Sequence, residues 1–109
     1  MNDLVEAWRC HLALDRRRSS HTVRAYMATA ERLIAFLEEH RGEAVTAGLL
    51  AKIEQADLRA FLTSRRMDGI GNISAARELS AVRGFLKFTG GEDARVPVLK
   101  GPRVKRGLP

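Results

Sequence analysis

The chain has 109 residues, the size of a single domain. It carries 19 Lys and Arg against 13 Asp and Glu, a formal net charge of +6, and its mean hydropathy is −0.22. These values exclude an integral membrane protein, because no apolar run approaches the roughly 20 residues that span a bilayer. A single cysteine, Cys10, excludes an internal disulfide and a cysteine-based zinc site. The acidic start lacks a signal-peptide layout, so we expect a soluble, cytoplasmic, basic domain.

The apolar residues recur at helical spacing, and strand-type alternation is absent. A first helix is expected over residues 2–15, with a buried stripe of Leu4, Val5, Trp8 and Leu12. Cys10 is expected to join this stripe as a small core residue.

The second helix has the clearest pattern in the chain. A serine or threonine of residues 19–22 caps its start, since a side-chain oxygen there accepts a backbone N–H of the first turn. A continuous apolar stripe follows from Val23 to Leu37, and Tyr26 falls on it as an expected core residue. The helix should end near Gly42, which can adopt the left-handed cap.

Residues 42–54 are expected to form a short turn or connector that buries Leu49, Leu50 and Ile53. A third long helix is expected over residues 55–67 and a fourth over residues 73–88, before a glycine-containing stop. The sequence therefore predicts an all-α bundle of four to five helices over residues 1–94. Residues 95–109 are expected to form an extended basic linker.

Positive charge is concentrated in three blocks. Residues 16–30 hold four arginines and no acid, residues 58–91 hold six basic and two acidic residues, and residues 95–109 hold five basic residues and no acid. If the fold gathers these blocks on one side, they present a positive face to a polyanion; a solvated surface is the other interpretation.

Two helix faces combine small and basic residues, which lets a helix approach nucleic acid closely. On the second helix these are Thr22, Ala25, Thr29 and Arg32, with Arg24 beside them and Ser19, Ser20 and His21 at the helix start. On the fourth they are Arg77, Ser80, Gly84 and Lys87, with Arg83 beside them. Gly84 in mid-helix costs about 1 kcal/mol relative to alanine, which indicates a close approach either to DNA or to a neighbouring helix.

No catalytic or metal-binding constellation is present. The three histidines (His11, His21 and His40) lack metal-ligand spacing, and no nucleophile has an adjacent base. We expect no cofactor and no small-molecule ligand.

Three motifs resemble the core-binding domain of the tyrosine recombinases (phage-integrase family), most closely the Xer type. They are Ser20–Tyr26, Asp57–Leu62 followed by Arg65, and Glu78–Phe88. The ending, Gly101–Pro109, is similar to the linker that leads into the family's catalytic domain.

The resemblance implies a SAM-like, non-catalytic DNA-binding domain, because the family's catalytic residues belong to a C-terminal domain with no counterpart here. It implies that the partners are duplex DNA, as a recombination half-site, and other recombinase subunits in a DNA-assembled tetramer. It also implies a location in the cytoplasm of a bacterium. Carried over, the DNA contacts are Ser20, His21, Thr22, Arg24, Ala25, Ser74, Arg77, Ser80, Arg83 and Lys87. The linker adds Lys100, Arg103, Lys105 and Arg106. The alternatives are a helical protein-interaction module and a helix-turn-helix regulator.

Overall fold

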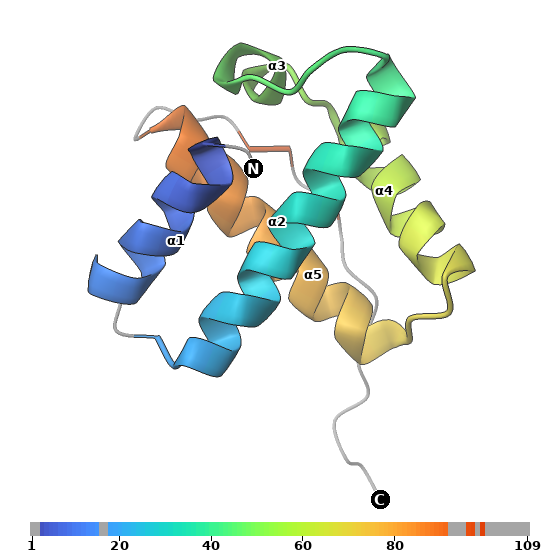
Figure 1. Cartoon of the computed structure of the whole chain (residues 1–109). Helices are drawn as coiled ribbons and strands as arrows, with labels where there is room; N and C mark the ends of the chain where they lie inside the picture. The colour runs from blue at the N-terminus through green and yellow to red at the C-terminus, as the bar shows by residue number, and fades with distance from the viewer. Residues whose placement is uncertain (1–2, 16–17, 92–95, 98, 100–109) are drawn as a thin grey trace, which may run out of the picture.

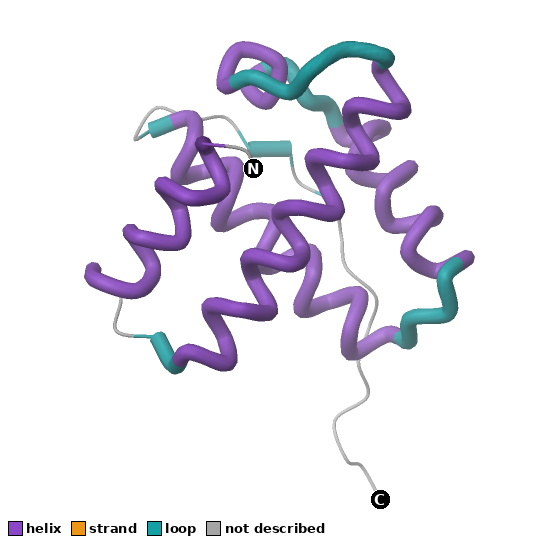
Figure 2. The backbone as a smooth tube through the Cα atoms, viewed as in Figure 1, coloured by secondary structure: helices purple, strands orange, loops and turns teal. Residues whose placement is uncertain are grey.

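The computed structural model describes residues 3–15, 18–91, 96–97 and 99. Within these residues every regular element is a helix (Figure 2). The elements are α1 (Asp3–Asp15), α2 (Ser20–Arg41), α3 (Ala47–Ala51), α4 (Gln55–Met67) and α5 (Asn72–Gly90). The predicted all-α class is confirmed.

α5 is the central helix, because it contacts each of the other four. α2 crosses it at an angle, with α1 to the left of the crossing, α4 to its right and α3 above it (Figure 1). The inward face of α5 carries Leu79, Val82 and Phe85, which are almost completely buried. Burial of such side chains against four neighbours supplies most of the stability of a small helical domain.

The predicted caps of α2 are both present. The Ser19 hydroxyl oxygen accepts a hydrogen bond from the Thr22 backbone N–H at 3.1 Å. At the other end Gly42 has a φ of 72°, and its N–H donates to the Glu38 carbonyl at 2.9 Å. A side chain at this left-handed position would be strained, which explains the glycine.

The segment expected as a turn or connector contains the short helix α3. Thr46 caps it, accepting from the Leu49 N–H at 3.1 Å. Leu49, Leu50 and Ile53 are all buried, as predicted. The short α3 therefore covers the core by packing against α5.

A carboxylate joins the end of α2 to the start of α4. Asp57 is only 7 % exposed and accepts from the Glu54 backbone N–H at 2.8 Å and from the Arg41 guanidinium at 2.6 Å. Burial alone raises the pKa of Asp57, but the hydrogen bonds from Glu54 and Arg41 outweigh it and hold this pKa below its ordinary value.

The expectation that Cys10 lies in the core is wrong, because its side chain is exposed. Cys10 follows the buried Trp8 by two positions, so it projects about 200° around the helix from that residue. The buried stripe of α1 consists of Val5, Trp8 and Leu12, with Leu4 packed at its edge.

Gly84 accommodates a neighbouring helix. A Cβ at this position would lie 3.3 Å from Cζ2 of Trp8, closer than most carbon contacts in proteins. Of the two explanations for this glycine, the structure supports the close approach of α1.

The chain beyond α5 returns to the core. Val96 packs against the core and Leu99 is 8 % exposed. The predicted linker contacts Lys100, Arg103, Lys105 and Arg106 lie outside the described residues. The expected boundary after residue 94 therefore stays a prediction.

Replacing Asp57 with alanine should lower the free energy of unfolding by about 1–2 kcal/mol, because it removes the cap of α4 and the partner of Arg41.

A carboxyl whose pKa is lowered by folding stabilises the native state above its unfolded pKa of about 3.9, and this contribution is lost as the pH falls through the folded pKa. Asp57→Ala should therefore show a smaller loss of stability between about pH 5 and 2. Urea denaturation over this range measures both effects. Glu31→Ala, at an exposed site on α2, is the control, and an equal change in both variants would contradict the assignment.

At Gly84, substitution by alanine should change stability little, because a gain of about 1 kcal/mol in helix propensity is offset by displacement of Trp8. Gly84→Val should destabilise the domain by about 1–3 kcal/mol through overpacking. Since Trp8 is the only tryptophan, its fluorescence reports the displacement directly. Gly48→Ala, where a Cβ would meet its nearest neighbour at 3.7 Å, should leave the emission unchanged. Unchanged emission in both Gly84 variants would contradict the close packing.

Candidate nucleic-acid interface

A groove between α2 and α5 brings together the two helix faces singled out by spacing. We call it the α2/α5 groove. From α2 it is lined by His21, Thr22, Ala25, Tyr26, Ala28, Thr29 and Arg32. From α5 it is lined by Ser74, Arg77, Glu78 and Ser80. Segments about 50 residues apart in sequence therefore form one surface.

A second hollow, the α1/α5 depression, continues this surface along α5. It is lined by Trp8, His11, Leu12, Arg18, Tyr26, Ser80, Gly84, Lys87, Phe88 and Gly91. Tyr26 and Ser80 line both hollows, so the two are adjacent. The whole α5 face of Arg77, Ser80, Gly84 and Lys87 therefore lies along one continuous surface.

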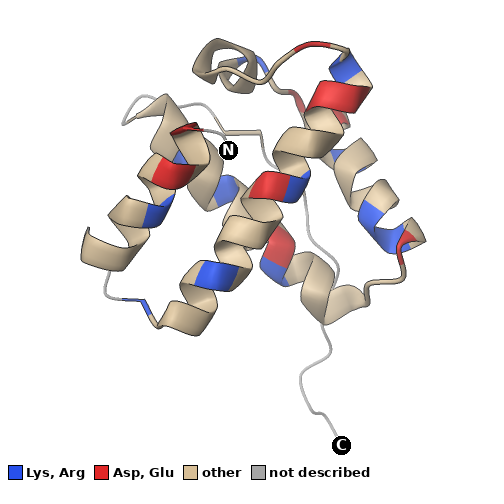
Figure 3. Cartoon of the chain, viewed as in Figure 1, with Lys and Arg blue, Asp and Glu red and all other residues tan. Residues whose placement is uncertain are grey.

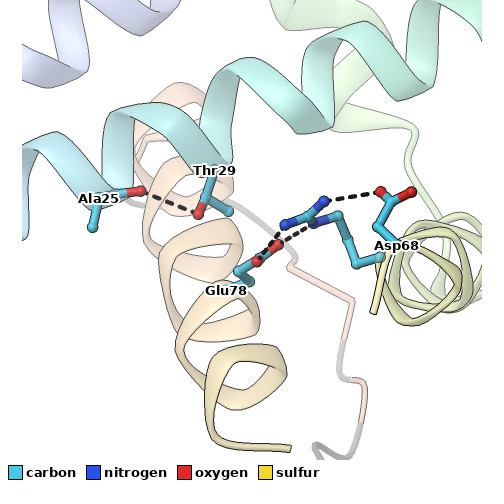
Figure 4. A network of polar contacts seen from close by, with 5 residues as sticks. Ala25, Thr29, Asp68 and Glu78 are labelled. Atoms are coloured by element: carbon cyan, nitrogen blue, oxygen red, sulfur yellow. Dashed lines mark hydrogen bonds and ion pairs between the residues drawn. The ribbon is translucent and has the colours of Figure 1, made fainter. Parts of the chain in front are cut away.

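Small side chains keep the groove open between the crossing helices. Thr29 is buried beneath it, and its hydroxyl donates to the Ala25 carbonyl of the preceding turn at 3.2 Å (Figure 4). This local bond satisfies the buried hydroxyl without a partner from α5. Serine at positions 74 and 80 likewise adds little bulk on the facing helix.

Among the described residues that line the groove, Glu78 is the only carboxylate, and Arg65 of α4 neutralises it. Its two oxygens accept from Nε and Nη2 of Arg65 at 2.8 and 3.1 Å, and Nη1 of Arg65 also donates to Asp68 at 2.9 Å (Figure 4). The hydrogen bond to Glu78 is the main reason that the pKa of Arg65 is raised. Both side chains are largely buried, at 15 % and 12 % exposure. The carboxylate therefore contributes little negative potential to the groove.

The cations that line the two hollows are not paired in this way. Among the described residues, Arg32, Arg77 and Lys87 form no ion pair with a carboxylate. The acidic residues of α2 lie mostly in its C-terminal half (Figure 3). The groove thus offers free positive charge to an anionic ligand.

Three of the expected contact residues, Ser20, Arg24 and Arg83, line neither the α2/α5 groove nor the α1/α5 depression. Arg24 lines a separate hollow between α1 and α2, together with Arg9, Arg18 and Ser20. Arg83 is exposed on α5 but lines neither the α2/α5 groove nor the α1/α5 depression. Arg24 and Arg83 therefore lie beside the predicted polar faces of their helices and not on them.

Sequence spacing missed two arginines that shape the surface. Arg65 acts through Glu78, which is 13 positions away, and helical periodicity carries no signal for such a pair. Arg18 precedes α2, where no periodic pattern applies, yet its Cζ lies 5.1 Å from the centre of the Tyr26 ring.

The described residues contain neither a candidate metal site nor a candidate membrane span. No group of three or more His, Cys, Asp and Glu side chains among them could hold a metal ion. None of the described helices is long and apolar enough to cross a membrane.

Residues 5–92 match the family described as phage integrase, N-terminal SAM-like domain. The chain belongs to this family. Similar curated proteins include the "Tyrosine recombinase XerC" of Nitrobacter winogradskyi, at 33 % identity over 96 % of this chain, and that of Bradyrhizobium diazoefficiens, at 35 % over 94 %. The protein of the same name from Methylobacterium sp. is 33 % identical over 100 % of this chain. No solved structure matches.

The chain spans about a third of the length of these relatives, 34 %, 33 % and 35 % respectively. The resemblance drawn from the three motifs is confirmed by the family match, and the chain is similar to the XerC core-binding domain.

The Arg65–Glu78 pair should show a measurable coupling in a double-mutant cycle. Arg65→Met leaves the buried Glu78 carboxylate without this partner, and Glu78→Gln does the same to the buried Arg65 cation. The losses in the free energy of unfolding of the two single variants should therefore sum to more than the loss in the double variant. We expect a coupling energy of about 1–2 kcal/mol from urea denaturation. The exposed pair Arg9–Glu6 on α1 is the control and should couple much more weakly. Equal coupling in the two pairs would contradict the buried role.

Proposed function

We propose that this chain is the DNA-binding domain of a XerC-like site-specific tyrosine recombinase, and that it grips one half-site of a recombination sequence. The observation that carries the proposal is the α2/α5 groove, where arginines from two helices line the same surface and have no carboxylate partner among the described residues. Family membership adds independent support.

Most of the affinity would come from backbone phosphates. Arg32 and Arg77 flank small hydroxyl side chains, a combination that contacts phosphate oxygens closely. Arginine also forms bidentate bonds to guanine, so Arg77 is the first candidate for a base contact, with Arg24 and Arg83 at the edges of the surface. His21, Thr22, Ala25, Ser74, Ser80 and Lys87 complete the proposed contact set, with Ser20 at the start of α2.

Strand cleavage would need residues outside this chain. The chain's single tyrosine, Tyr26, packs against the core and stacks on Trp8, so it lacks the free position of a nucleophile. We therefore assign binding to this domain and cleavage and rejoining to the remainder of a longer protein. Other recombinase subunits on the same DNA would be its protein partners, and the acidic α1 offers one surface for them.

A helical protein-interaction module is the second candidate. The large exposed apolar side chains among the described residues are Leu14, Met67 and Ile73, on three different helices. They do not form the broad apolar patch that such a module needs. The observations therefore favour DNA.

Duplex DNA binding should depend steeply on salt. With six or more phosphate contacts, affinity should fall by about a thousandfold or more between about 50 and 200 mM salt. Arg77→Ala should lower the affinity about five- to tenfold and reduce the slope of log K against log salt by about 1. Fluorescence anisotropy with a labelled recombination site measures both quantities.

Arg59→Ala is the matched control, because Arg59 is exposed on α4 and lines neither hollow. It should bind like the unchanged chain. Binding that is indifferent to salt, or equal losses in the Arg77 and Arg59 variants, would contradict the proposed interface.

A further inference from the structure

We infer that Arg18 forms an additional phosphate-binding position on this domain, built by stacking its guanidinium on the Tyr26 ring. The inference rests on the proposed DNA-binding function and extends its interface past the α2/α5 groove into the α1/α5 depression. The ligand is a backbone phosphate of the DNA duplex that binds in the α2/α5 groove.

A layered aromatic support fixes the position of Arg18. Its Cζ lies 5.1 Å from the centre of the Tyr26 ring, within the range of a cation–π contact. The same ring stacks on Trp8 at 5.8 Å with an interplanar angle of 14°, and Trp8 contacts Phe85 at 5.2 Å. The guanidinium is therefore anchored to the buried core through two rings, which lowers the entropy lost when it binds a ligand.

Among the side chains that the structure describes, none is an anionic partner of the Arg18 guanidinium. Its Nε is buried and has no hydrogen-bond acceptor, and no carboxylate among the described residues pairs with it. A buried donor without an acceptor is unfavourable, and a full positive charge beside it attracts an anion. Arg18 thus differs from Arg65 and Arg41, whose charges are already neutralised by Glu78 and Asp57.

The surroundings of Arg18 suit a phosphate. The α1/α5 depression is also lined by Lys87 and the Ser80 hydroxyl, and none of the described residues that line it is acidic. Its shared residues, Tyr26 and Ser80, make it continuous with the α2/α5 groove. A duplex that contacts Arg77 in the groove would therefore have further phosphates near Arg18 and Lys87.

The test compares Arg18→Met, Arg18→Lys and the unchanged 109-residue chain in duplex binding at several salt concentrations. Methionine preserves the apolar contact with Tyr26 but removes the charge. It should weaken binding about three- to tenfold at about 50 mM salt and lower the salt slope by about 0.9. Lysine keeps the charge, so Arg18→Lys should restore most of the slope.

Arg59→Met is the matched control, and urea denaturation of each variant checks that the fold is intact. A purely structural role for Arg18 would lower stability without changing the salt slope of the folded protein. If the unchanged chain binds and Arg18→Met binds with the same affinity and slope, Arg18 is not a phosphate contact, while the proposed function stands. If the unchanged chain shows no salt-dependent binding, both proposals fail.

Discussion

The packing of α5 against α2 is the contact on which the rest of this domain depends. α5 touches all four other helices, so its buried face of Leu79, Val82 and Phe85 organises the core. The same crossing determines which polar residues meet outside the core. A helix that buries one stripe must expose the adjoining positions, and here the exposed edges of the two helices form the α2/α5 groove.

Charge is arranged in layers around that groove. Arg65 lies behind Glu78 and cancels its charge, so that an acidic residue can be accommodated beside Arg77 without weakening the positive surface. At the far end of α2, away from the groove, the Asp57 carboxylate neutralises the charge of Arg41. The cations left without carboxylate partners among the described residues include those that line the groove and the depression.

The aromatic residues connect the core to this polar surface. Phe85, Trp8 and Tyr26 form a chain of ring contacts from α5 through α1 to α2. Gly84 permits it, since a side chain there would press against Trp8. A glycine that costs helix stability thus lets α1 approach α5 and supports the ring on which Arg18 lies.

The sequence alone determined the four long helices and the caps of α2, because helical periodicity and capping act over a few residues. The stripe of α2, Ser19 at its start and Gly42 at its end were all predictable, as were the two polar faces and the family. Periodicity did not predict that Cys10 lies outside the core, because an isolated small residue near a stripe fits either face. Only the tertiary structure decided that the two faces meet, that Arg24 and Arg83 lie outside the groove, and that Arg65 neutralises Glu78. These relations depend on the crossing of helices distant in sequence, and local spacing carries no record of that geometry.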